Sequence, residues 1–89
     1  MISRTSARFR ECLASLPANV RRQASRAYGR FRSDPDHPSL RFKRLRTARP
    51  VWSVRISIDY RALGVRDGDV IVWFWVGSHA DYDDLIARL

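Results

Sequence analysis

Residues 52–76, WSVRISIDYRALGVRDGDVIVWFWV, determine the fold of this 89-residue chain. From Trp52 to Asp59, apolar and polar residues alternate with a period of two, which is typical of a strand with one buried face. Residues 70–76 are apolar throughout and predict a central buried strand. Residues 60–65 predict a strand between these two, and the Asp-Gly within residues 66–69 predicts a hairpin turn. The core of the predicted fold is therefore an antiparallel meander.

Two amphipathic helices are predicted before this meander. Apolar residues at helical spacing predict a first helix over about residues 6–15, which Pro17 ends. A stripe of apolar residues that starts at Val20 predicts a second helix over about residues 18–32. The break between them is short, so we expect the two helices to form an antiparallel hairpin.

The remaining segments complete the prediction. Two prolines make residues 34–38 a loop, and the alternation from Leu40 to Arg46 predicts a further strand. Residues 81–89 predict a short closing helix. The expected fold class is α+β, with an N-terminal antiparallel helical hairpin packed on a three- to four-stranded antiparallel sheet and a short C-terminal helix. A single domain over residues 1–89 is expected at this length.

Positive charge is concentrated in the first half of the chain. There are 17 Lys and Arg against 9 Asp and Glu, which gives a net charge of +8. Residues 1–49 hold 13 cations and 3 acids, whereas residues 50–89 hold 4 cations and 6 acids. All cations except Lys43 are arginines, whose guanidinium groups bind phosphate bidentately. A polyanionic partner is expected, either nucleic acid or an acidic protein segment, although a GC-rich genome also enriches arginine.

Several classes of protein are not expected. No apolar run approaches the roughly 20 residues of a membrane-spanning helix. The polar residues after Ile2 predict no signal peptide, so the cytoplasm is the expected compartment. Cys12 is the only cysteine, and the two histidines are far apart in the sequence, so we expect no intramolecular disulfide, no metal site and no cofactor.

Short motifs occur in a recognisable order along nearly the whole chain. They are Leu16-Pro17 to Val20-Arg21, the loop from Asp34 to Leu40, Phe42-Lys43-Arg44-Leu45, Val54-Arg55, Asp59-Tyr60-Arg61-Ala62-Leu63, and residues 77–83 (GSHADYD). In this order they resemble the RelE/ParE superfamily, the toxins of bacterial type II toxin–antitoxin systems. The first strand of that family is nearly absent, because residues 2–4 could supply only a stub.

The resemblance implies a toxin that a cognate antitoxin silences, and the charge suggests that the antitoxin has an acidic segment. Many such toxins cleave mRNA on the ribosome without a metal, when the ribose 2′-hydroxyl attacks the adjacent phosphate and leaves a cyclic phosphate. We favour this activity, that of an RNA-binding mRNA interferase of the RelE-like branch, which inhibits translation. The alternatives are inhibition of DNA gyrase, as in the ParE branch, and an inactive toxin acting in an autoregulatory antitoxin complex.

RNA cleavage of this kind requires a base, an acid and cations around the phosphate. His79 is the candidate base or acid, because imidazole transfers protons near neutral pH. Tyr82 corresponds to a family aromatic that stacks on or protonates the substrate, and its alternative role is core packing. Arg61 and Arg55 correspond to cationic positions of the family and would stabilise charge, since guanidinium keeps its proton. The alternatives are an exposed loop histidine, and arginines that face solvent or the antitoxin.

Lys43, Arg44 and Arg46 are the candidate RNA-binding residues of the predicted strand. Their alternative role is to keep a solvated edge strand charged against aggregation. Ser53 stands where ribonucleases of the family often have a second lysine, so the proton transfer would depend on His79. His37 lies between Asp36 and Pro38, and we interpret it as a residue that shapes its loop.

The apolar strand carries three consecutive aromatic residues. A regular period of two places Trp73 and Trp75 on one face of the strand and Phe74 on the other. At least one face must be covered by the helices or by a partner. An exposed aromatic pair would mark a docking surface.

Overall fold

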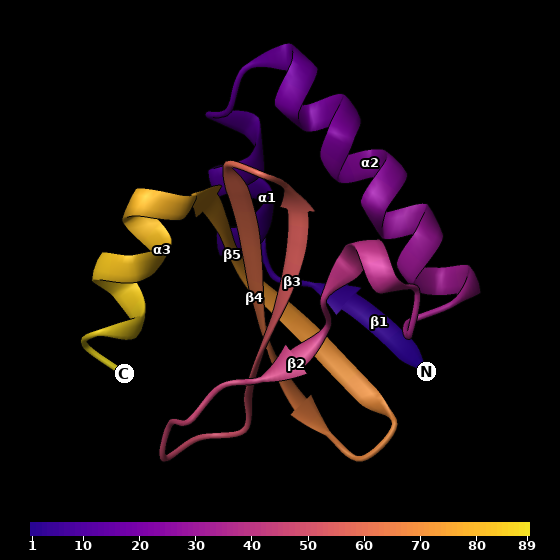
Figure 1. The fold of residues 1–89 in the computed structure, drawn as a ribbon, viewed down its shortest axis with the longest axis vertical. Helices are drawn as coiled ribbons and strands as arrows, with labels where there is room; N and C mark the ends of the chain where they lie inside the picture. Colours follow the sequence, from indigo (N-terminus) through magenta and orange to yellow (C-terminus); the bar gives the residue numbers. More distant parts are fainter.

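The structure, a computed structural model, describes residues 1–89 as three helices around a five-stranded sheet (Figure 1). The elements in chain order are β1 (Ile2–Thr5), α1 (Ala7–Ala14), α2 (Ala18–Ser33), a 3-10 turn (Pro38–Leu40), β2 (Lys43–Arg44), β3 (Val51–Ser57), β4 (Tyr60–Asp67), β5 (Val70–Ser78) and α3 (His79–Ile86). The predicted α+β class and the predicted order of helices and strands are confirmed. None of the helices has the length and apolar character needed to cross a membrane.

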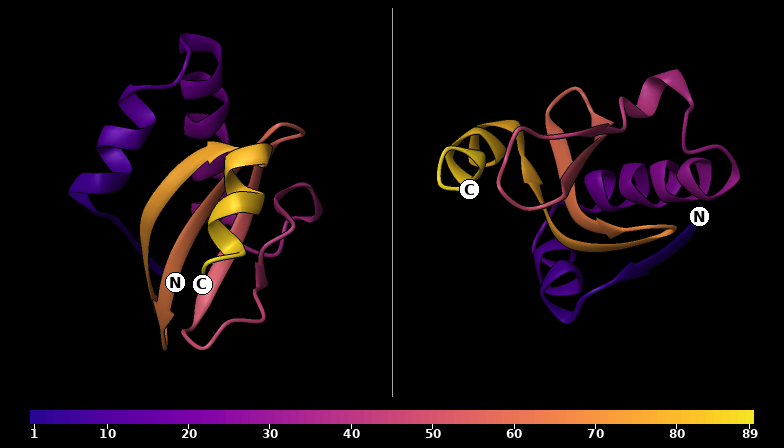
Figure 2. Two further views of the ribbon diagram at one scale, coloured as in Figure 1. Left: turned by 90° about the vertical axis from the view of Figure 1, so that its left-hand side faces the viewer. Right: turned by 90° about the horizontal axis from the view of Figure 1, so that it is seen from below.

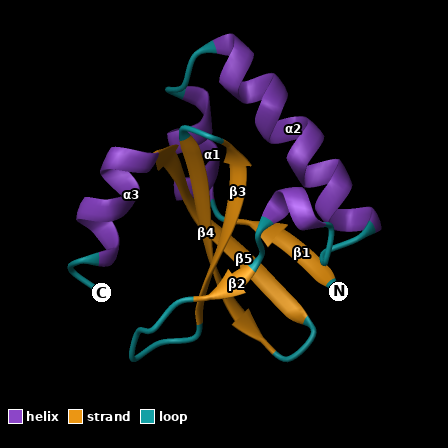
Figure 3. Cartoon of the chain, in the orientation of Figure 1, coloured by secondary structure: helices purple, strands orange, loops and turns teal.

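The sheet has the strand order β1-β5-β4-β3-β2, and it is mixed rather than antiparallel throughout (Figure 3). Strand β1 runs parallel to β5, from the pair Ile2–Val70 to the pair Thr5–Trp73, and all other neighbours are antiparallel. Residues 2–5 therefore form a complete edge strand where the sequence suggests only a stub. The partners of these residues are distant in the sequence. For example, the Trp73 indole N–H donates a hydrogen bond to Ser3 Oγ at 2.9 Å.

Strand β2 is shorter than the predicted strand from Leu40 to Arg46. Residues Pro38–Leu40 form a 3-10 turn, and the His37 Nδ1 accepts a hydrogen bond from the backbone N–H of Ser39 at 3.2 Å. The turn ends at Arg41, which has a positive φ of 46°. After this turn, only Lys43 and Arg44 pair with β3. The predicted strand is too long because alternation of apolar and polar residues does not reveal a turn at its start.

The helices cover the two faces of the sheet (Figure 2). Helices α1 and α2 run in opposite directions, as predicted, and pack chiefly against β5 and β3. Their side of the sheet carries the larger core, made by Phe9, Ala27, Phe31, Leu40, Val54, Ala62, Ile71, Trp73 and Val76. Helix α3 lies on the opposite face, over a smaller core of Val51, Leu63 and Tyr82.

A β-bulge in β5 corrects the prediction for the aromatic residues. Leu63 pairs with Trp75 and the next residue, Gly64, pairs with Trp73, so Phe74 is an extra residue without a partner. A bulge of this kind reverses the alternation of side chains along a strand. Trp73 accordingly lies in the larger core, whereas Phe74 and Trp75 both pack against the smaller core under α3. The two tryptophans therefore lie on opposite faces of the sheet, and the prediction that Trp73 and Trp75 share one face is wrong.

Gly64 lets the sheet pack closely beside this bulge. A Cβ at this position would lie 2.8 Å from the Trp73 ring and 2.9 Å from the Ile71 side chain, and both residues are buried.

We expect Gly64→Ala to lower the free energy of unfolding by about 1–3 kcal/mol, because the well-packed core must shift. The matched control is Gly29→Ala on α2, where a Cβ meets nothing within 4 Å. That variant should gain about 0.5–1 kcal/mol through helix propensity. Urea unfolding of both variants measures the difference, and equal midpoints would contradict the packing described here.

Candidate functional site

A cationic hollow lies at the α3 face of the sheet, where β3 and β4 meet the start of α3. Its volume is about 160 Å³, and it is lined by Arg41, Lys43, Ser53, Arg55, Arg61, His79 and Tyr82. The lining comprises four basic residues, one histidine and two hydroxyl side chains, with no carboxylate. All four candidate catalytic residues named from the sequence are among them. Such a site is suited to a phosphate group.

Two arginines face each other across adjacent strands in this hollow. Arg55 on β3 is paired directly with Arg61 on β4. Neither guanidinium lies within 4.0 Å of a carboxylate, since the only ion pairs in the chain are Met1–Asp69 and His79–Asp83. Like charges directly opposite each other in a sheet destabilise it. The chain thus holds a repulsive pair that a bound anion would neutralise.

Arg61 is fixed in place by backbone carbonyl groups. Its Nη1 donates to the carbonyl oxygens of Ser57 at 2.6 Å, Tyr60 at 2.9 Å and Ile58 at 3.3 Å. These three bonds hold the guanidinium in the β3–β4 turn and leave its Nε and Nη2 without a protein acceptor. Burial lowers the pKa of Arg61, and the positive charge of Arg55 lowers it further. Burial and the neighbouring Arg55 both make the positively charged form of Arg61 less favourable.

His79 is the first residue of α3, whereas the sequence predicts that helix from residue 81. The helix begins earlier because Ser78 caps it, accepting a hydrogen bond from the Asp81 N–H at 3.1 Å. The backbone N–H of His79 donates to the Asp59 carbonyl at 2.7 Å, which ties the helix start to the β3–β4 turn. Its ring Nδ1 lies 3.2 Å from Asp83 Oδ2. A carboxylate at this nitrogen favours the tautomer with the proton on Nδ1, which leaves Nε2 free to accept one.

Tyr82 lies at the base of the hollow and is a core residue, with only 6 % of its surface exposed. Its hydroxyl donates to Ser53 Oγ at 3.2 Å, and its ring meets the His79 ring edge-on at a centroid distance of 5.7 Å. Ser53 is equally enclosed, at 2 % exposure. This pair supports the floor of the hollow and the position of the imidazole. The packing role considered for Tyr82 therefore matches its surroundings better than proton donation.

The three candidate RNA-binding residues are divided between different surfaces. Lys43 pairs with Ser53 and lines the hollow. Arg44 pairs with Trp52, on the face that carries the larger core, and Arg46 is an exposed residue after β2. Arg41 lines the hollow together with Lys43, although no motif in the sequence selects it. Arg41 has a left-handed backbone conformation, which turns it toward the hollow. The only hint of this conformation in the sequence is the position of Arg41, a non-glycine residue directly after the Pro-Ser-Leu turn.

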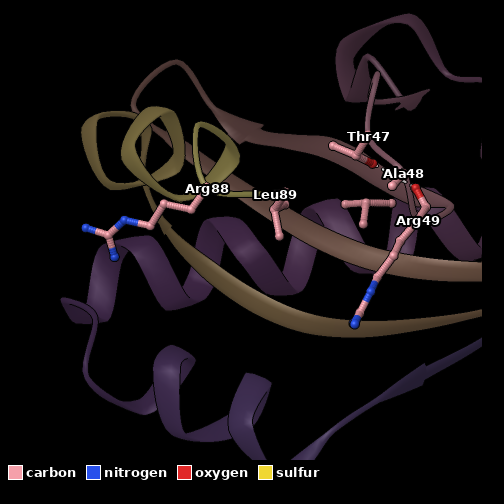
Figure 4. Close-up of a pocket in the computed structure, with 6 residues that line it drawn as sticks. Thr47, Ala48, Arg49, Arg88 and Leu89 are labelled. Carbon is pink, nitrogen blue, oxygen red and sulfur yellow. Dashed lines mark hydrogen bonds between the residues drawn. The ribbon is translucent and has the colours of Figure 1, made fainter.

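A separate apolar surface lies beside α3, toward the end of the chain. One hollow of about 340 Å³ is lined by Thr47, Ala48, Arg49, Val51, Arg88 and Leu89 (Figure 4). In Figure 4 Leu89 lies between α3 and the loop of residues 47–49, whereas the Arg88 guanidinium extends away from that loop. An adjoining groove is lined by Arg8, Arg49, Val51, Val65, Phe74, Leu85 and Leu89. These surfaces contain no histidine or carboxylate, so they are not sites for proton transfer.

Comparison with known proteins identifies the family. Residues 18–84 match the family described as ParE-like toxin domain, which is most of the chain and includes every residue of the hollow. This chain belongs to the ParE-like toxin domain family. It is a toxin of the RelE/ParE superfamily, as the order of its motifs predicts. Comparison with curated protein sequences gives no significant match.

Solved structures of such toxins share the fold of this ParE-like toxin. The RelB–RelE antitoxin–toxin complex of Methanococcus jannaschii matches with a TM-score of 0.73 at 16 % identity, over 92 % of this chain and 96 % of that chain. The RelBE2 complex of Mycobacterium tuberculosis gives 0.68 at 23 % identity, covering 88 % and 96 %. The isolated RelE toxin of E. coli gives 0.63 at 17 % identity, covering 98 % and 96 %. The likeness is one of fold at these identities.

The arginine pair of this ParE-like toxin should make its stability depend on anions. We expect Arg55→Gln to raise the free energy of unfolding by up to about 1 kcal/mol at low salt, because it removes a like-charge pair. Inorganic phosphate should stabilise the wild-type protein and should stabilise Arg55→Gln much less. Arg61→Gln should instead lower stability, since it loses bonds to three carbonyl groups. Thermal unfolding with and without phosphate tests this, and an equal phosphate effect in wild type and Arg55→Gln would contradict it.

Proposed function

We propose that this toxin is a metal-independent, ribosome-dependent endoribonuclease that cleaves mRNA and thereby stops translation. The observation that carries the proposal is the juxtaposition of a histidine with an unneutralised arginine pair in one hollow. Arginines suit the phosphate, and a histidine with a free Nε2 suits removal of a hydroxyl proton. Neither the apolar groove nor any other hollow of the chain combines these groups.

The cleavage can be written with the groups of the hollow. His79 Nε2 removes the proton of the ribose 2′-hydroxyl, and the 2′-oxygen forms a bond to the adjacent phosphorus. Arg55 and Arg61 bind the non-bridging oxygens, on which negative charge increases in the transition state. The bond from phosphorus to the 5′-oxygen then breaks, which leaves a 2′,3′-cyclic phosphate on one product. Asp83 orients the imidazole through Nδ1 and stabilises it when it is protonated.

The leaving 5′-oxygen needs a proton from a second group. We assign this role to Lys43, whose ammonium can release a proton, whereas guanidinium groups cannot. Lys43 lines the hollow from β2, whereas His79 lines it from α3. Tyr82 is less suitable, because its hydroxyl is buried and already donates to Ser53. Base and acid would then come from two different elements of the chain, α3 and β2.

A cognate antitoxin with an acidic segment is the second part of the proposal. The apolar groove beside α3 offers five apolar side chains, with Arg8 and Arg49 at its rim. Val65 and Val72, which are paired between β4 and β5, are both partly exposed on this face. An amphipathic segment with acidic residues would cover the apolar strip and pair with the arginines. RelE–RelB complexes among the solved structures support an antitoxin as the partner.

The test of the nuclease proposal is induced expression of the toxin in growing cells, followed by growth and mRNA integrity. We expect growth arrest with cleaved messages for the wild type. His79→Ala should reduce cleavage by about 10²–10⁴-fold, because it removes the base. Arg55→Gln should also restore growth while it keeps the fold. The matched control is His37→Asn in the 3-10 turn, where an amide can still accept the Ser39 N–H, and it should arrest growth like the wild type.

Two other outcomes would favour the alternatives. Arrest with intact messages and reduced DNA supercoiling would indicate gyrase as the target, a reading that the ParE-like family description supports. Absence of arrest for every variant would indicate an inactive toxin that acts within an antitoxin complex. Either result would refute the nuclease proposal.

The antitoxin groove can be tested by a single charge. We expect Val65→Glu to escape neutralisation when it is expressed together with its antitoxin, because the new carboxylate repels an acidic segment and lies in the apolar strip. Ile2→Glu is the control, since Ile2 is also exposed but lies outside the groove. Growth of the co-expressing strains is the measurement. Full neutralisation of Val65→Glu would show that the antitoxin binds elsewhere.

A further inference from the structure

Helix α2 presents a basic surface that the hollow does not use. Its exposed side carries Arg21, Arg22, Arg26, Arg30 and Arg32, and the helix contains no acidic residue. None of the five is within ion-pair distance of a carboxylate. Arg22, Arg26 and Arg30 are four residues apart and therefore lie in one row, with a separation of about 6 Å along the axis. A solvated helix face of ordinary composition would mix both signs of charge.

A groove accompanies this row. Between α2 and the end of β3 lies a hollow of about 210 Å³, lined by Gln23, Arg26, Ala27, Arg30, Ile56 and Ser57. Its polar groups are two guanidiniums, an amide and a hydroxyl, and all of them can donate hydrogen bonds. Two guanidiniums, which only donate, beside an amide and a hydroxyl that can also donate, fit the oxygens of a sugar–phosphate backbone.

The groove and the cationic hollow adjoin the same turn from opposite faces of the sheet. Ser57 lines the groove, and its carbonyl accepts the Arg61 hydrogen bond that fixes Arg61 in the hollow. In Figure 1 the β3–β4 turn lies between α3 and α2. Ile58 at the tip of this turn is 71 % exposed, so an apolar surface for a base separates the two cationic sites.

We propose that the α2 groove is a second binding site for the RNA backbone, and that one single strand passes from the hollow over the β3–β4 turn onto α2. This inference rests on the proposed nuclease function, since it extends the path of the same substrate. An acidic protein segment fits less well, because protein partners need an apolar centre. The groove beside α3 supplies such a centre, whereas the lining of the α2 groove is mostly polar.

The test uses 2′-O-methyl oligonucleotides, which lack the attacking hydroxyl and are therefore not cleaved. A trinucleotide can place a phosphate in the hollow but is too short to follow the whole path, whereas a dodecanucleotide is long enough to reach α2. Arg22→Gln/Arg26→Gln should weaken binding of the dodecanucleotide about tenfold and should reduce the slope of log affinity against log salt by about 1.4. Binding of the trinucleotide should not change in this variant and should depend on Arg55. Fluorescence anisotropy at several salt concentrations measures both.

The control is Arg4→Gln/Arg8→Gln, which removes the same charge from β1 and α1 and should leave both slopes unchanged. Equal weakening by the two double variants would overturn the inference, because net charge alone would explain it. Loss of binding to polyglutamate but not to the dodecanucleotide would also overturn it and would assign α2 to a protein. In both cases, Arg55-dependent binding of the trinucleotide would leave the nuclease proposal standing. Failure of the dodecanucleotide to bind would overturn the inference, and the nuclease proposal would then be decided separately by the growth and mRNA test.

Discussion

The extra residue in β5 is the constraint on which the remaining architecture depends. Because Phe74 has no partner on β4, the strand changes phase half-way along its length. The half before the bulge sends Ile71 and Trp73 into the core under α1 and α2, and the bulge itself sends Phe74 and Trp75 under α3. One strand thus supplies both hydrophobic cores. Without this change of phase, Trp75 would face the larger core and only Phe74 would support α3, the helix that carries the imidazole of the site.

The hollow forms where several elements are held by backbone groups rather than by side-chain packing alone. The Asp59 carbonyl receives the first N–H of α3, and three further carbonyls of the same turn receive Arg61. A single turn therefore positions both the imidazole and a guanidinium. Positioning by one turn allows a chain of 89 residues to form this site in a shallow hollow. The repulsion between Arg55 and Arg61 destabilises the sheet. Hydrophobic packing must offset this repulsion until an anion binds.

Much of the fold could be predicted, because its signals are local. The alternation of β3, the apolar run of β5 and the stripe of α2 each follow from neighbouring residues, and the bounds of α2 differ from prediction by one residue. The four candidate catalytic residues and Lys43 also meet in one hollow, whereas Arg44 and Arg46 lie outside it. Three features could not be predicted, since they depend on distant partners: the pairing of β1, the bulge at Phe74 and the left-handed Arg41. The separation of Arg44 from Lys43 follows from the period of two in β2, because successive residues of a strand point to opposite faces of the sheet.

The parallel pairing of β1 with β5 also has a consequence for how the chain folds. The first strand finds its only partner about 70 residues later, at Val70–Trp73, so the sheet closes through one of the longest loops that this chain could form. Contacts between such distant residues make folding slow, because the entropy of loop closure precedes any gain from the contact. The larger core likewise needs Val76, and the smaller core needs Tyr82 from α3. A chain that is synthesised from its N-terminus therefore cannot complete β1, either core or the helix that carries His79 until residues 70–86 are available.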